Sequence, residues 1–70
     1  MTTLALITLA QDARDKGRNV LSASYHLDCA VDAYRRGIDQ WARDQALWSI
    51  ELSAGKDSSA YRQATASASE

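Results

Sequence analysis

The chain contains no proline and only three glycines among its 70 residues. Proline breaks the interior of a helix and glycine weakens it, so long stretches of the sequence lack both helix breakers. The remainder is rich in Ala, Leu, Arg and Gln, which are good helix formers. The composition therefore predicts an all-α fold.

Large apolar side chains are also scarce. Phenylalanine is absent, and the chain has thirteen Ala against seven Leu, three Ile and two Val. A chain of about this length buries only about 60% of the surface that it exposes when unfolded, so its stability is marginal unless it associates. We therefore expect the protein to assemble as a homodimer.

The net charge and the cysteine content exclude further classes of binding partner and of covalent cross-link. The net charge is −1, so no strong positive field attracts nucleic acid or an anionic membrane. The single cysteine, Cys29, excludes an internal disulfide and fits a reducing compartment. The apolar start of the chain lacks the basic residues of a signal peptide and is too short to cross a bilayer. These features predict a cytoplasmic protein without membrane contact, and the Arg-rich, Ala-rich composition is typical of a GC-rich bacterial or phage genome.

Helix start and stop signals divide the chain. Thr2 or Thr3 can cap a first helix, and Gly17, Gly37 and Gly55 each stand two residues before an Asn or Asp that can cap the next. These signals predict helices at about 3–16, 20–36 and 39–53 within a helical domain of residues 1–54. The apolar pattern runs on through Gly37, which leaves open one continuous helix for the last two. The expected architecture is an antiparallel helical hairpin or a small three-helix bundle.

The C-terminal segment has a different composition. Ten of the eighteen residues from 53 to 70 are Ser or Ala, and Tyr61 is the one large apolar side chain. Such a segment has little to bury. We expect residues 55–70 to form a weakly helical or disordered tail that the fold does not need.

Large side chains recur every seven residues from Val20 to Trp48, and a second set occupies the alternate positions. This heptad pattern predicts one buried stripe. The opposite side of 41–54 carries a second apolar surface, which we expect to contact another chain. The pattern predicts a core of Leu27, Val31, Tyr34, Ile38, Trp41 and Leu52, and a second surface of Ala42, Ala46, Leu47, Ile50 and Ala54.

Catalytic and metal sites are not expected. His26 and Cys29 stand three residues apart, but a closed metal site needs four ligands and the chain has no second His or Cys. A nucleophilic cysteine needs a base that a third group orients, and none is evident. A DNA-binding helix-turn-helix around Gly37 is disfavoured because Asp32, Arg36 and Arg43 would fall at buried positions. We predict no enzyme activity and no cofactor.

Binding of a larger protein is the function that the sequence favours, because Trp, Tyr and Arg dominate binding hot spots. In build, the chain is similar to small non-enzymatic regulators of phages and plasmids, including ROP-type hairpin dimers, which implies an inhibitor of a host machine such as a transcription factor. The alternative is nucleic-acid binding through an Arg stripe, which is otherwise disfavoured by the charge. The candidate partner-binding residues are Tyr25, Arg36, Arg43, Leu47, Trp48 and Ile50, and the alternative stripe comprises Arg35, Arg36, Arg43 and Arg62.

Overall fold

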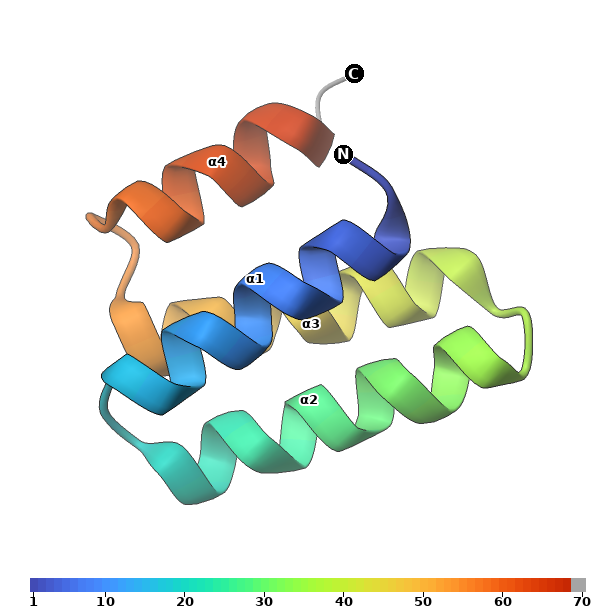
Figure 1. Ribbon diagram of the computed structural model, residues 1–70, viewed down its shortest axis with the longest axis horizontal. Coiled ribbons are helices and arrows are strands. Elements are labelled where there is room, and N and C mark those ends of the chain that lie inside the picture. Colours follow the sequence, from blue (N-terminus) through green and yellow to red (C-terminus); the bar gives the residue numbers. More distant parts are fainter. Residues whose placement is uncertain (69–70) are drawn as a thin grey trace.

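The computed structural model describes residues 1–68 and contains four α-helices and no strand in that range. The helices are α1 (Thr3–Lys16), α2 (Val20–Arg35), α3 (Asp39–Ala54) and α4 (Ser59–Ala68), as Figure 1 shows. The all-α prediction is confirmed. The chain folds as a small helical bundle.

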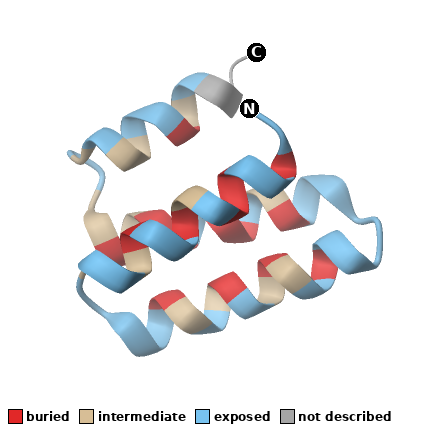
Figure 2. Cartoon of the chain, viewed as in Figure 1, coloured by how far each residue is buried: buried red, intermediate tan, exposed pale blue. Residues whose placement is uncertain are grey.

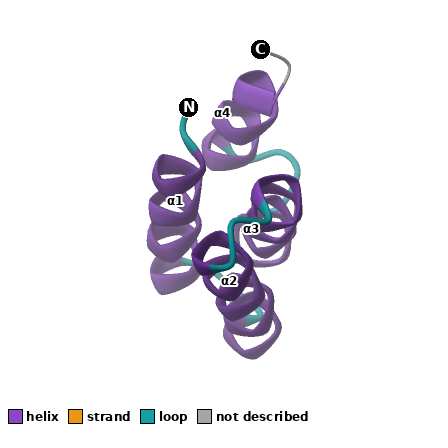
Figure 3. Cartoon of the chain, turned by 90° about the vertical axis from the view of Figure 1, so that its right-hand side faces the viewer, coloured by secondary structure: helices purple, strands orange, loops and turns teal. Residues whose placement is uncertain are grey.

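The first three helices form a triangular bundle, which is clearest end-on in Figure 3. α2 and α3 run antiparallel, α1 packs on both of them, and α4 packs on α1 and α3 without contacting α2 in the described part of the chain. The Cα atoms span only 13 Å in the thinnest direction. Packed helix axes lie about 8–10 Å apart, so this thickness leaves one side of every helix in solvent.

The turn between α2 and α3 settles whether the helix breaks at Gly37. The Ile38 amide donates to the Ala33 carbonyl at 2.9 Å, and the Gly37 amide donates to the Tyr34 carbonyl at 3.1 Å. This pair of hydrogen bonds is a Schellman motif, which requires a left-handed residue such as Gly37 at φ 77°. At the start of the chain, the Thr2 hydroxyl caps α1 by accepting from the Ala5 amide at 3.1 Å. Residues close in sequence therefore set the end of α2 and the start of α1.

The connection between α1 and α2 is held against α3. The Arg18 amide donates to the Ser53 carbonyl at 2.8 Å, and a Cβ atom on Gly17 would lie 2.1 Å from that same oxygen. Asn19 adopts a left-handed conformation, and its side-chain amide donates to the Leu52 carbonyl at 3.1 Å. The prediction that the Asn19 side chain caps α2 is therefore wrong, because this side chain ties the loop to α3 instead.

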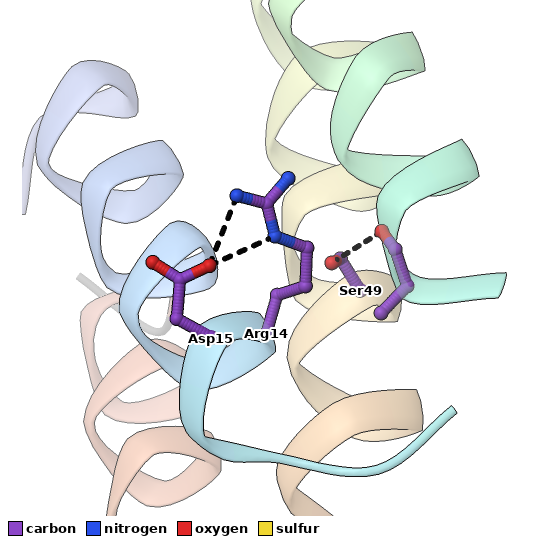
Figure 4. Close-up of polar contacts among 4 residues, drawn as sticks. Arg14, Asp15 and Ser49 are labelled. Atoms are coloured by element: carbon purple, nitrogen blue, oxygen red, sulfur yellow. Dashed lines mark hydrogen bonds and ion pairs between the residues drawn. The ribbon is translucent and has the colours of Figure 1, made fainter. Parts of the chain in front are cut away.

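Small residues dominate the interior, and Figure 2 shows the buried positions as one stripe on each of the first three helices. Their short side chains let the helix backbones approach closely. The Ser49 hydroxyl of α3 donates to the Ala23 carbonyl of α2 at 2.7 Å, as Figure 4 shows. The apolar core comprises Leu6, Ile7, Ala10, Ala13, Leu27, Ala30, Ala46, Ile50 and Ala64.

The predicted core is correct only in part. Leu27 is buried, Val31 packs on the core, and Leu52 is half-buried. Trp41, in contrast, is 53% exposed, and Tyr34 and Ile38 are also exposed. The heptad pattern is present in the sequence. However, α3 turns its Ala and Ser side inward, because the narrow space between the helices does not hold an indole ring.

The same rotation of α3 corrects the second apolar surface. Ala42, Ala46 and Ile50 have no exposed surface, and Leu47 and Ala54 pack against the core. Ile50 therefore cannot contact an outside partner in the folded monomer. α1, α2 and α4 all pack on α3, so the surface that we expected to contact a second chain is occupied from within.

The segment after Gly55 is more ordered than its composition predicted. The Ser58 hydroxyl accepts from the Tyr61 amide at 3.0 Å and donates to the Gly55 carbonyl at 2.7 Å, which caps α4. Ala64 is buried in the core, and Tyr61 packs against it. The segment predicted as a tail thus contains a helix that packs on the bundle, because a side of small residues is enough for close packing. Residues 69 and 70 lie outside the described residues.

We predict that Gly17→Ala destabilises the fold by about 1–3 kcal/mol, the usual cost of overpacking, because its Cβ would meet the Ser53 carbonyl. Gly37→Asn is the control, since a Cβ there meets nothing within 4 Å and Asn tolerates a left-handed backbone. Urea denaturation of both variants measures the difference. Equal losses would show that the α1–α2 loop does not lie against α3 as described.

We also predict that Ile50→Ala lowers the free energy of unfolding by about 2–5 kcal/mol, as for other buried aliphatic residues. Trp41→Ala should change it by less than about 1 kcal/mol, because half of the indole is already in water. Circular dichroism during thermal unfolding gives both values. A reversed order would mean that α3 faces the interior with its Trp side, as the heptad predicted.

Candidate protein-binding surface

Exposed aromatic side chains gather on one side of the α2–α3 pair. Trp41 and Trp48 are seven residues apart and therefore lie on the same side of α3, 53% and 48% exposed. This side is roughly opposite to Ala46 and Ile50, which face α1. We use the term aromatic face for Tyr25, His26 and Cys29 of α2 together with Trp41 and Trp48 of α3.

Ring contacts join the two helices across this face. The His26 ring stacks on Trp48 with a centroid distance of 4.2 Å and an interplanar angle of 17°. Tyr25 contacts the His26 ring edge-on, with a distance of 5.1 Å between the two ring centroids. Tyr25 is itself 66% exposed. The result is a continuous aromatic row whose outer surface lies in water.

A buried amide fixes the position of His26. Gln45 is only 4% exposed and lies one helical turn from both Trp41 and Trp48. Its Oε1 accepts a hydrogen bond of 2.7 Å from Nδ1 of His26. The sequence offered one signal for this contact, a polar Gln in an otherwise apolar stripe, but the partner becomes evident only when α2 and α3 are paired.

Acidic side chains border the aromatic face. Asp44 is exposed and lies one turn from each Trp, and Asp28 lies one turn from Tyr25. Neither forms an ion pair within the described residues, whereas Asp32 pairs with Arg36 at 3.1 Å. Asp44 also accepts a hydrogen bond of 2.9 Å from the side-chain amide of Gln40, an uncharged donor. The border of the face is therefore negative.

The predicted partner-binding residues divide into two groups. Tyr25 and Trp48 lie on the aromatic face, and Arg36 is exposed at the end of α2. Leu47 and Ile50 pack inward, as described above.

Arg43 has an intramolecular role. Its Nη1 donates to the Thr3 hydroxyl and its Nη2 to the Met1 carbonyl, both at 3.1 Å, and the Thr3 hydroxyl donates to Asp39. Arg43 thus ties the start of the chain to α3. It was assigned to partner binding because the sequence does not reveal that the N-terminus lies beside it.

The Arg residues proposed as a nucleic-acid stripe do not form one surface. Arg35 and Arg36 lie at the end of α2, and Arg43 is bound to the N-terminal residues. Arg62 is on α4, which does not contact α2.

Within residues 1–68, no group of three or more His, Cys, Asp or Glu side chains is placed to hold a metal ion. None of the helices in that range is long and apolar enough to cross a membrane. An open pocket lies between the ends of α1 and α3 and the start of α4, and the Asp12–Lys16 ion pair stands in its wall.

Comparison with known proteins finds no matching family, no similar curated protein and no similar solved structure.

We predict that His26→Ala destabilises the protein by about 1–3 kcal/mol, because it leaves the buried Gln45 amide without its partner. Adding Gln45→Leu should recover part of this loss, since the unpaired polar group is then removed. Tyr25→Ala is the control and should cost no more than about 0.5 kcal/mol. A double-mutant cycle in urea measures the coupling. If His26→Ala were as mild as Tyr25→Ala, the hydrogen bond would not hold the face together.

Proposed function

We propose that this chain is a small non-enzymatic module that binds a larger protein through the aromatic face. A regulator or inhibitor of a bacterial protein such as a transcription factor, of the kind that phages and plasmids use, fits this role. The observation that carries the proposal is the pair of half-exposed tryptophans, Trp41 and Trp48, on the side of α3 that faces away from its buried Ala46 and Ile50. Exposed Trp and Tyr are the side chains most enriched in binding hot spots.

The size of the face fits the centre of a modest interface. Each large aromatic side chain can bury about 150–250 Å², so three that are about half-exposed offer about 300 Å² between them. A stable interface buries about 800 Å² per partner, of which the centre is apolar and the border polar. The aromatic row would supply the apolar centre, and the surrounding charged residues would supply the border.

A homodimer is the second candidate. It is favoured by the number of large apolar side chains that this small monomer exposes, among them Leu21, Tyr25, Trp41 and Trp48. Two copies that meet through the aromatic face would cover these tryptophans. Nucleic-acid binding has less support, because the Arg residues are dispersed and the aromatic face has an acidic border.

We predict that the wild-type chain captures a protein from a bacterial lysate and that Trp41→Ser and Tyr25→Ser each reduce the captured amount by about tenfold, a loss typical of one hot-spot residue. Leu4→Ser is the matched control, since Leu4 is 54% exposed but lies on α1. Nuclease treatment should change nothing.

Sedimentation equilibrium of the same variants tests the second candidate. A wild-type dimer that Trp41→Ser converts to a monomer would assign the face to self-association. Capture that is lost after nuclease treatment would assign the chain to nucleic acid, and capture that is equal for all variants would contradict the role of the aromatic face.

A further inference from the structure

We propose that the occupant of the aromatic face is an amphipathic helix whose apolar stripe is flanked by Lys or Arg. This inference rests on the proposed function, and it specifies the chemistry of the partner. Three observations carry it: the antiparallel pair of helices that forms the face, the exposed acids at its border that form no ion pair among the described residues, and the way in which α1 occupies the opposite side of the same pair.

The geometry of α2 and α3 suits a third helix. α1 packs against one side of the antiparallel α2–α3 pair. It does so with Leu6, Ile7, Ala10 and Ala13, which are buried and recur with helical spacing. The aromatic face lies on the other side of the pair, where the His26 ring of α2 stacks on Trp48 of α3. Recognition of a partner's amphipathic helix through its apolar side is a common mode of peptide binding.

The acidic residues at the border of the aromatic face determine which residues can flank the apolar stripe of that helix. Asp44 lies beside both tryptophans and Asp28 lies beside Tyr25, and neither has a cationic partner among the described residues. A helix seated on the aromatic row would bring its flanking residues to these carboxylates. Lys or Arg there would form ion pairs, whereas Glu or Asp would be repelled.

The same charges disfavour a second copy as the occupant. In a symmetric dimer the same surface meets itself, so the border acids of one copy would approach those of the other. Within the segment 20–54, Asp32 pairs with Arg36 and Glu51 pairs with Lys56, whereas Asp28 and Asp44 of the border form no ion pair among the described residues. A basic helix is therefore the better complement of this face.

The test uses three synthetic peptides of roughly 18 residues, or about five helical turns. The first has Leu at helical spacing flanked by Lys, the second has Glu in place of each Lys, and the third has the composition of the first with its Leu positions scrambled. Binding to the full chain is followed by tryptophan fluorescence and by NMR shifts of the indole groups. The Lys peptide should bind at least about tenfold more tightly than the other two, and more weakly as salt rises.

Matched variants locate the contacts. Asp28→Asn combined with Asp44→Asn should weaken binding of the Lys peptide about three- to tenfold, in proportion to two border ion pairs. Asp57→Asn is the control, because Asp57 is exposed in the loop before α4 and forms no ion pair within the described residues. Trp41→Ser should weaken binding further.

Three results would overturn the inference. They are equal or tighter binding of the Glu peptide, equal binding of the scrambled peptide, and binding of the Lys peptide that Trp41→Ser leaves unchanged. If the lysate capture depends on Trp41 while these peptides fail, the inference is wrong and the proposed function stands. If neither the lysate capture nor the binding of the Lys peptide depends on Trp41, both the inference and the proposed function are wrong. A stable dimer that Trp41→Ser dissociates would replace the basic helix with a second copy.

Discussion

Close approach of helix backbones along the small-residue side of α3 is the constraint on which the rest of the structure depends. Ala42, Ala46 and Ser49 have no exposed surface, and Ser53 has almost none. Short side chains there let α1 and α2 come near enough for Ser49 to reach a carbonyl of α2, and for the Gly17 loop to lie on the Ser53 carbonyl. Such contacts gain dispersion energy over many atom pairs and satisfy buried polar groups at the same time. They also leave no room for large rings.

The position of the tryptophans follows from that lack of room. A helix packs only one of its sides against a narrow core. Because α3 packs its Ala and Ser side there, Trp41 and Trp48 must face away from the core. The Trp48 ring is held in place, because His26 stacks on it and is itself hydrogen-bonded to the buried Gln45. A ring that is fixed before binding loses little conformational freedom when a partner arrives. The packing of the core thus prepares the surface for binding.

The helices could be predicted from the sequence, whereas the face that each presents could not. Thr2 and Gly37 act through hydrogen bonds to residues a few positions away, so their roles are visible locally. The burial of Ile50 depends on α1, which lies more than thirty residues earlier in the chain. Both the Trp stripe and the Ala stripe of α3 have helical spacing, and size alone suggested that the larger side chains go inside. Asn19 and Arg43 were misread for the same reason, since their partners are distant in sequence.

A core of small residues also links the stability of this chain to its binding. Each buried methylene contributes about 0.8 kcal/mol, so alanines contribute far less than the Leu or Phe residues that usually fill an interior. The largest apolar side chains of the chain are instead on the aromatic face, where they stabilise the fold only when something covers them. A ligand that binds the folded chain alone raises its stability in proportion to the logarithm of its concentration. The side chains that the narrow core excludes therefore become the ones through which a partner stabilises the whole bundle.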